Sequence, residues 1–398
     1  MVIAHCPADK EGGGMSGELI SKFGQGVKAF MTRRLRIQSD GIPYEFDRLP
    51  LKKIVNACLV EASIFFKPER PWGWPTHLMV EPSARCNLHC ALCPVTAGLE
   101  RSQGFMDLVV FKKVIDEVGD YVFTVLLWDW GEPFLNPSIY AMISYARQKE
   151  IKVVSSTNGH LFGSADHADR LILSGIDTII FAVDGISQET YSRYRQGGDL
   201  ESALQGIRTV VARKRALRSK TPLVNFRFIV MGHNEHEIPR LKDLAKSLGV
   251  DALTLKTLNN CLRDPYVGGE SGHPEGNREF LPRNQYYQRF KYDSTGLERV
   301  RLRRNPCKQL WCNPTIHWSG SVVPCTFDPK DKYILGDVRE DSLRKIWSGA
   351  AYRQMRRRFR TGWEKISLCA ECSYAYKGGN LRCDTIADAF FFGNDINQ

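Results

Sequence analysis

From residue 77 onward, six short runs rich in β-branched residues alternate with longer segments of helical length and periodicity. The expected strands span residues 77–82, 122–130, 151–156, 178–183, 224–230 and 252–256, and the expected helices span residues 108–118, 139–149, 165–174, 200–214 and 235–248. This alternation predicts parallel strands joined by right-handed crossovers. The expected fold class is therefore α/β, a partial TIM-like (β/α)6 barrel with its active site at the carboxyl ends of the strands.

The rest of the chain divides around this barrel. We expect a helical leader and linker over residues 1–76, the barrel over 77–260, a connecting segment over 261–306, a small C-terminal domain over 307–385 and a tail over 386–398. Within the leader, helices are expected over residues 20–37 and 51–66. Such amphipathic helices can make peripheral membrane contact, but packing against the barrel is the commoner fate and the one we expect.

Charge and composition narrow the class of protein. The chain has 398 residues, of which 43% are hydrophobic, and a formal net charge of +11. Arg-rich runs at residues 299–304 and 353–360 favour an anionic substrate or partner. They lack the interleaved aromatic residues of a nucleic-acid site, so we expect solvated helix faces there and no nucleic-acid partner. The N-terminus has no secretory signal pattern, which predicts a cytoplasmic protein whose 12 cysteines are reduced.

The first cysteine motif is a C-x3-C-x2-C triplet formed by Cys86, Cys90 and Cys93, directly after the first expected strand. Three thiolates at this spacing can bind three irons of a [4Fe-4S] cluster and leave the fourth iron open. Two alternatives use the same residues: a zinc site with His89 as fourth ligand, and buried free thiols.

At this triplet the sequence resembles the radical S-adenosylmethionine (radical SAM) superfamily. The resemblance implies that the open iron binds S-adenosyl-L-methionine (SAM) and that electron transfer cleaves it to a 5′-deoxyadenosyl radical, which abstracts hydrogen from the substrate. It also implies a reductant such as flavodoxin or ferredoxin.

Further residues occupy the places where this family contacts SAM, at the ends of successive strands. The resemblance assigns the Gly131-Glu132-Pro133 motif to the amino group of the methionine part of SAM, and Arg195 to its carboxylate. The short polar residues at strand ends that can reach the ribose and carboxylate are Ser156, Asn158 and Asp184. Each residue alone reads as a turn or cap residue, but their order along the strands supports the resemblance.

A second cysteine set resembles the auxiliary-cluster domains called SPASM and twitch. Cys307 and Cys325 form a C-x12-G-x4-C pattern, and Cys369 and Cys372 form C-x2-C. The resemblance implies one auxiliary [4Fe-4S] cluster with these four ligands, because only Cys383 follows where a two-cluster domain would carry more cysteines. A structural zinc site is the alternative for the same four thiols.

Two cysteines of this region, Cys312 and Cys383, are left over. They can be buried free thiols, replacement ligands or thiols near the substrate.

The expected function is a radical SAM oxidoreductase that oxidises the substrate radical through the auxiliary cluster, with a small molecule or peptide as substrate. The first alternative is a peptide maturase that forms a cross-link or an epimer. Such enzymes often carry three strands for peptide recognition, and we expect no such trio in the leader. An alternative of another class is a non-catalytic iron–sulfur or zinc-binding protein.

Overall fold

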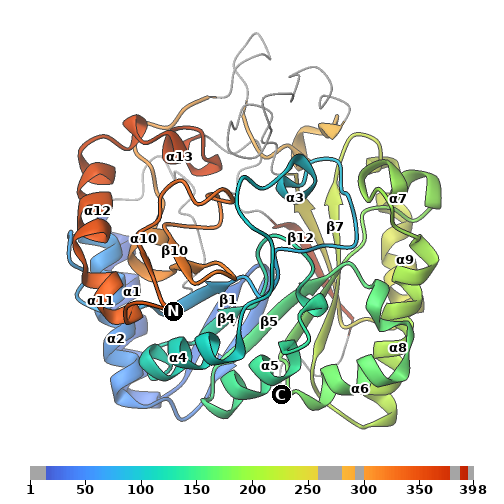
Figure 1. Ribbon diagram of the computed structural model, residues 1–398, viewed down its shortest axis with the longest axis horizontal. Coiled ribbons are helices and arrows are strands. Elements are labelled where there is room, and N and C mark those ends of the chain that lie inside the picture. The colour runs from blue at the N-terminus through green and yellow to red at the C-terminus, as the bar shows by residue number, and fades with distance from the viewer. Residues whose placement is uncertain (1–14, 259–279, 292–299, 377–385, 393–398) are drawn as a thin grey trace.

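The computed structural model describes residues 15–258, 280–291, 300–376 and 386–392, with the side chains of residues 15–23 left out (Figure 1). Its main sheet has ten strands in the order β11-β10-β9-β3-β4-β5-β6-β7-β8-β12. The six central strands are parallel to one another. They are β3 (His77–Val80), β4 (Thr124–Leu126), β5 (Lys152–Thr157), β6 (Thr178–Ala182), β7 (Leu223–Val230) and β8 (Ala252–Thr257).

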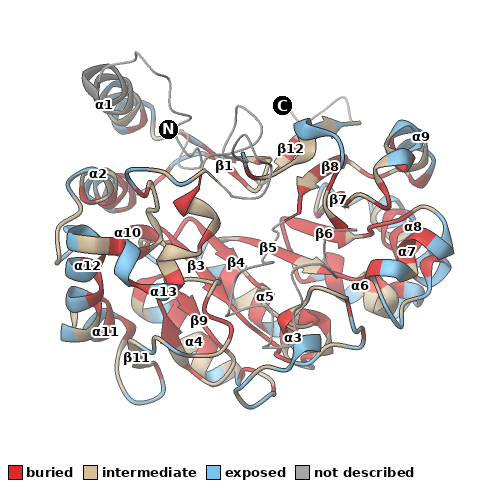
Figure 2. Ribbon diagram, turned by 90° about the horizontal axis from the view of Figure 1, so that it is seen from above, coloured by how far each residue is buried: buried red, intermediate tan, exposed pale blue. Residues whose placement is uncertain are grey.

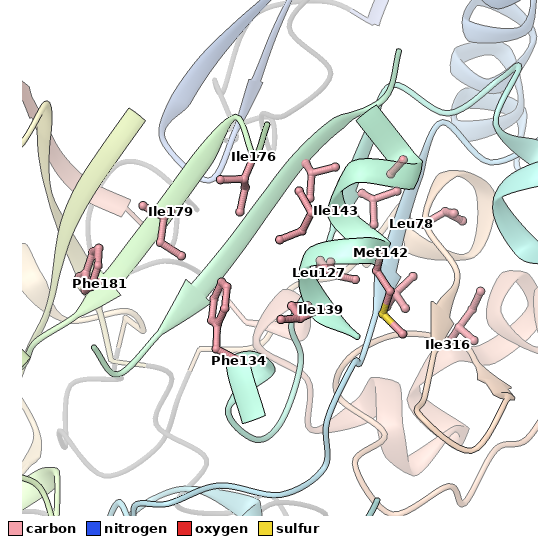
Figure 3. Packing of buried hydrophobic residues seen from close by; sticks show 14 of the residues in the cluster. Leu78, Leu127, Phe134, Ile139, Met142, Ile143, Ile176, Ile179, Phe181 and Ile316 are labelled. Carbon is pink, nitrogen blue, oxygen red and sulfur yellow. The ribbon is translucent and has the colours of Figure 1, made fainter. Parts of the chain in front are cut away.

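These strands confirm the predicted α/β class with its parallel sheet. Helices follow the strands in the predicted alternation: α4 (Leu108–Val118), α5 (Ile139–Gln148), α6 (Ala165–Leu173), α8 (Leu200–Ala216) and α9 (Ile238–Leu248). Two short helices that were not predicted, α3 (Pro94–Ala97) and α7 (Gln188–Tyr194), lie between them. Figure 2 shows buried residues concentrated on the sheet and exposed residues on the outward faces of these helices. In Figure 3, Ile139, Met142 and Ile143 of α5 lie against the sheet near Leu127.

Short 3-10 turns connect several elements. They are η1 (Pro133–Leu135), η2 (His160–Gly163), η3 (Glu235–Glu237), η5 (Gln285–Tyr287), η6 (Trp363–Lys365) and η7 (Ser373–Ala375). The strand predicted over residues 122–130 is shorter than expected, because the backbone beyond Leu126 leaves the ladder and turns at Gly131, where φ is +98°. That turn directs the end of β4 toward the cysteine loop.

The leader contains a hairpin that the sequence analysis did not predict. Helix α1 (Met15–Thr32) ends before the expected residue 37, and β1 (Leu35–Ser39) pairs antiparallel with β2 (Ile42–Phe46) ahead of α2 (Leu51–Phe66). The prediction of a helix over residues 33–37 is wrong because the buried residues alternate in this segment, as in a strand. The turn between the strands, residues 40–41, has positive φ at both positions, which suits an Asp-Gly pair.

This hairpin packs against the inner face of the parallel sheet. Its apolar side chains form one cluster with Phe123, Val154, Ile180 and Ala252, which come from four different strands or strand starts. The Tyr44 hydroxyl donates to Oγ1 of Thr178 at 3.0 Å. The hairpin therefore fills the interior at the amino ends of the strands, while the carboxyl ends remain for the site.

The C-terminal region continues the sheet at both edges. Strand β9 (Thr315–Ile316) pairs parallel with β3, and β10 (Ser321–Val323) and β11 (Gly336–Asp337) extend it. The helices here are α10 (Gln309–Cys312), α11 (Leu343–Ser348), α12 (Ala350–Gly362) and α13 (Ser367–Ala370). The segment expected as a tail supplies β12 (Ile386–Phe391), which pairs antiparallel with β8.

Within the described residues, none of the helices has the length and apolar character needed to cross a lipid bilayer. The predicted arginine run of α12 is only partly a solvated face. Arg356 is fully buried and donates to the carbonyl oxygens of Leu310 at 2.8 Å and Trp347 at 2.8 Å. It therefore ties α12 to α10 and α11.

Candidate active site

The first cysteine motif lies on the loop after β3. Two backbone hydrogen bonds hold this loop against the end of α7 and the segment after it: His89 N donates to Gln196 O and Ala91 N donates to Tyr194 O, both at 2.9 Å. Burial raises the pKa of Cys86 to about 11 and that of Cys93 to about 12. The negative charge of a neighbouring thiolate adds to the rise: Cys90 acts on Cys86, and both Cys86 and Cys90 act on Cys93. The three side chains therefore converge, as ligands to one cluster must, and binding of metal would stabilise their thiolates.

The end of β4 is fixed directly against the cysteine loop. At Gly131 an added Cβ would lie 2.5 Å from Ser83 O and 2.8 Å from Arg85 O, so no other residue fits there. The next residue, Glu132, donates its backbone N–H to Arg85 O at 2.8 Å. Pro133 begins η1, where its missing N–H costs nothing. The Gly-Glu-Pro motif thus has a local structural reason at each position.

The Glu132 side chain is buried, with 2% of its surface exposed. Its Oε1 accepts from Phe134 N at 3.2 Å and its Oε2 accepts from Asn158 N at 2.8 Å. Burial raises its pKa to about 7, although these N–H groups and the Arg195 charge oppose the rise. A cation bound beside this carboxylate would lower that pKa again.

Two more predicted residues lie at the end of β5. The Asn158 side chain donates to Asn87 Oδ1 at 2.7 Å, which links the strand end to the cysteine loop. Ser156 lies on β5 and is partly exposed, whereas its neighbours Ser155 and Thr157 are buried. The structure therefore brings Glu132, Asn158 and the cysteine loop together, with Ser156 two residues before Asn158 on β5.

Arg195 and Asp184 form a buried ion pair next to the first cysteine motif. Arg195 Nε and Nη2 both contact Oδ2 of Asp184, at 2.7 and 2.6 Å. Asp184 Oδ1 accepts from Ile229 N at 2.7 Å, and Arg195 Nη1 lies 3.7 Å from Cys90 Sγ. Despite burial, the carboxylate and the neighbouring thiol raise the pKa of Arg195 above its ordinary value. Asp184 is thus placed behind Arg195, which it orients toward the cysteine loop.

The second cysteine set also converges. Burial raises the pKa of Cys307 to about 11 and that of Cys372 to about 12. Burial also raises the pKa values of Cys325 and Cys369. The electrostatic influence of one thiol on another extends to every pair among these four. Four side chains from widely separated positions in the chain therefore lie near one another, which is compatible with a fully ligated cluster.

Cys312 is buried on α10, where its Sγ lies 3.4 Å from Lys308 O. Cys383 lies outside the described residues. In the described part of the chain, no group of three or more His, Cys, Asp or Glu side chains is arranged to hold a single metal ion.

A buried charge network that sequence reasoning missed joins the two cysteine regions. His317, which is fully buried, forms ion pairs with Asp331 and with Asp129, the latter at 3.4 Å from Nε2 to Oδ2. Asp129 also accepts from the hydroxyl of Thr326, the residue after Cys325. Both carboxylates raise the pKa of His317 to about 10 against the effect of burial. No sequence motif marks these residues, because they meet only through the pairing of β9 with β3.

Glu81 completes this network from the end of β3. Its carboxylate forms two hydrogen bonds with the guanidinium of Arg101, at 2.9 and 2.6 Å, and accepts from Trp318 N at 3.2 Å. Burial raises the pKa of Glu81 in spite of this pairing. One carboxylate thereby binds two segments: the loop after the first cysteine motif through Arg101, and the β9–β10 turn through Trp318.

Comparison with known proteins agrees with this geometry. The model of the radical SAM superfamily matches residues 80–245, and that of the SPASM iron-sulfur cluster-binding domain matches residues 307–373. A tungsten-containing aldehyde ferredoxin oxidoreductase cofactor-modifying protein of Pyrococcus furiosus is 25% identical over 328 residues, 75% of this chain and 87% of the relative. An AdoMet-dependent heme synthase of Methanosarcina barkeri is 24% identical over 330 residues, 75% of this chain and 89% of the relative.

Among solved structures, Streptococcus suis SuiB bound to its precursor peptide SuiA matches with a TM-score of 0.53. The match has 14% sequence identity and covers 86% of this chain and 80% of that one. At this level of identity the likeness concerns the fold.

Proposed function

Since the chain belongs to the radical SAM superfamily and carries a C-terminal SPASM iron-sulfur domain, we propose that it oxidises its substrate by two electrons. When bound, the first cluster and SAM supply a hydrogen-abstracting radical, and the auxiliary cluster supplies an acceptor for the second electron. The substrate then loses one hydrogen atom, one electron and one proton.

The observation that carries this proposal is the convergence of four cysteine thiols in the C-terminal domain. A cluster with four protein ligands has no open iron for the substrate. Electron transfer is therefore the role that we propose for it. Flavodoxin or ferredoxin is the proposed reductant for the first cluster.

This chain's own residues are proposed to bind SAM in the following way. Glu132 accepts a hydrogen bond from the amino group of the methionine part, because its carboxylate is buried beside the cysteine loop. Arg195 binds the carboxylate, and Asp184 positions Arg195. Ser156 and Asn158 supply polar contacts from the end of β5.

The substrate class is a small molecule or a peptide. The printed names of the relatives include a cofactor-modifying protein and a heme synthase, and SuiB is bound to a precursor peptide. The leader gives less support to a peptide maturase. Its two strands bury their apolar side chains against the barrel, and the described leader has no third strand.

The test compares the wild-type protein with the double variant Cys369→Ala/Cys372→Ala after anaerobic reconstitution. We expect about eight irons in the wild type and about four in the variant, since each cube holds four. The variant should still cleave SAM to 5′-deoxyadenosine at the first cluster, but it should not oxidise the substrate. A variant that loses four irons and still oxidises the substrate would exclude electron transfer by the auxiliary cluster.

The matched control is Cys58→Ala, which alters an exposed cysteine on α2 that belongs to neither set. Its iron content and both activities should equal those of the wild type. A double variant that keeps all eight irons would instead assign the auxiliary ligands to other cysteines of this domain.

A further inference from the structure

The inner face of the parallel sheet changes character along the strands. Near their amino ends the inward residues Val154, Ile180 and Ala252 are buried against the leader hairpin. Further along the same face, the inward residues are partly exposed: Leu126, Ser156, Ala182, Ile229 and Lys256. Solvent therefore reaches this upper layer of the interior, on the side of the sheet that carries the proposed SAM contacts. Lys256 is the charged residue among these five.

The charges around Lys256 are unequal in number. Below it, Arg227 pairs with Asp40 of the leader hairpin and donates to Thr254 Oγ1 at 3.2 Å, so these groups satisfy one another. To the side, Arg289 donates to Ser373 Oγ at 2.9 Å. Among the residues that the structure describes, the Lys256 side chain has neither an ion pair nor a hydrogen bond.

Two carboxylates act on Lys256: Asp184, which is already paired with Arg195, and Asp40, which three cations share. Although burial opposes its ionisation, Arg227, Lys256 and Arg289 hold the pKa of Asp40 below its ordinary value. Burial lowers the pKa of Lys256, and repulsion from the two arginines adds to this effect. Excess positive charge that is partly withdrawn from water is unfavourable unless an anion compensates it. A bound anion would provide that compensation.

The excess positive charge lies near both cysteine regions. Lys256 lies within electrostatic range of Asp184, which orients Arg195 beside the first motif. Arg289 lies within such range of Cys372 in the auxiliary set and of Lys256 itself. An anion held by Lys256 and Arg289 would therefore lie between the SAM contacts and the auxiliary thiols.

We propose that the substrate carries an anionic group, a phosphate or a carboxylate, which is bound by Lys256 on the inner face of β8 and by Arg289 on the segment that follows η5. The inference rests on the proposed function in one respect, namely that the molecule bound here is the substrate. The anion site itself requires neither hydrogen abstraction nor electron transfer, so the two proposals can fail separately.

The test measures acylation of Lys256 by a lysine-reactive reagent in the reconstituted protein with SAM, followed by peptide mass spectrometry. Inorganic phosphate and acetate are the two probes, each compared with chloride at equal ionic strength. At a probe concentration about ten times its dissociation constant, acylation of Lys256 should slow about tenfold, because only the anion-free fraction reacts. Protection by phosphate alone or by acetate alone identifies which anionic group the site prefers.

Two controls make the result specific. Lys149 is already paired with Asp116 at 2.9 Å, and its acylation should not respond to either probe. Arg289→Gln should raise the dissociation constant of the protecting anion about tenfold, the loss of one charge-assisted hydrogen bond. No protection of Lys256, equal protection at Lys149, no effect of Arg289→Gln or a Lys256 that is never acylated would each overturn the proposal.

Discussion

At the scale of single residues, Glu132 combines a structural and a binding role in one buried carboxylate. Its two oxygens hold η1 and the end of β5 through backbone N–H groups, so its position is fixed before any ligand arrives. An acceptor fixed in this way loses little conformational entropy on binding. The same carboxylate has a raised pKa, which binding of a cationic group would lower.

We predict that Glu132→Gln weakens SAM binding about tenfold or more, the effect of losing a charge-assisted hydrogen bond worth roughly 1.5–3 kcal/mol. Isothermal titration of SAM into the reconstituted variant measures this change. Glu189→Gln, at an exposed carboxylate on α7, is the control and should leave the affinity unchanged. Equal SAM affinity in wild type and Glu132→Gln would remove Glu132 from the binding site.

At the same scale, the sequence predicted the residues that belong to a motif and missed those that meet only in space. The Cys86 triplet and Gly131 could be found because neighbouring residues fix their spacing along the chain. His317 and Asp129 carry no such local signal, because strand pairing between β3 and β9 brings them together. The roles proposed for the predicted SAM contacts await the measurements described above.

At the scale of elements, helix bounds were predicted accurately where the local sequence signals were strong. Helix α4 has the predicted bounds, residues 108–118, and Asp107 caps it by accepting from Val109 N at 2.6 Å. The β1–β2 hairpin was missed although its signals were present, an Asp40-Gly41 pair between alternating apolar residues. Basic residues among apolar ones favour an amphipathic helix as well as a strand, and burial against the barrel decided the outcome.

The ion pair between Asp40 of the hairpin and Arg227 leads to a prediction, because Asp40 compensates the buried charge of Arg227. Asp40→Ala should destabilise the protein by about 3–5 kcal/mol, the cost of leaving a buried charge unpaired. Asp47→Ala is the matched control in the same hairpin region, since Asp47 pairs with Arg34 on the surface. Its effect should be about 0–1 kcal/mol. Denaturant unfolding of both variants measures the difference, and similar losses would contradict the buried pair.

At the scale of the whole molecule, charged groups join the barrel to the SPASM domain. His317 lies between Asp129 of the barrel and Asp331 of the C-terminal domain, and Thr326 extends the contact to the residue beside Cys325. The backbone pairing of β3 with β9 lies next to these contacts. The two domains are therefore held by side chains and by one continuous sheet.

This network predicts a pH dependence of stability. The pKa of His317 is about 10 in the folded protein and ordinarily 6.5, so its stabilising charge is fully present below pH 6.5 and is lost as pH rises through 10. The free energy of unfolding of wild type should fall over this range more steeply than that of His317→Gln. His236→Gln, at an exposed histidine, should retain the wild-type slope. Parallel slopes in wild type and His317→Gln would contradict a charged His317.

The pairing of β9 and β12 with the two outer strands of the barrel has a consequence for the order of synthesis. Both β3 and β8 are covered by segments that lie far toward the C-terminus. While the chain emerges from the ribosome, the six parallel strands can form before either cover exists, and their open edges can pair with another chain. Emergence of β9 and β12 therefore completes the protection of a barrel whose own strands were synthesised much earlier.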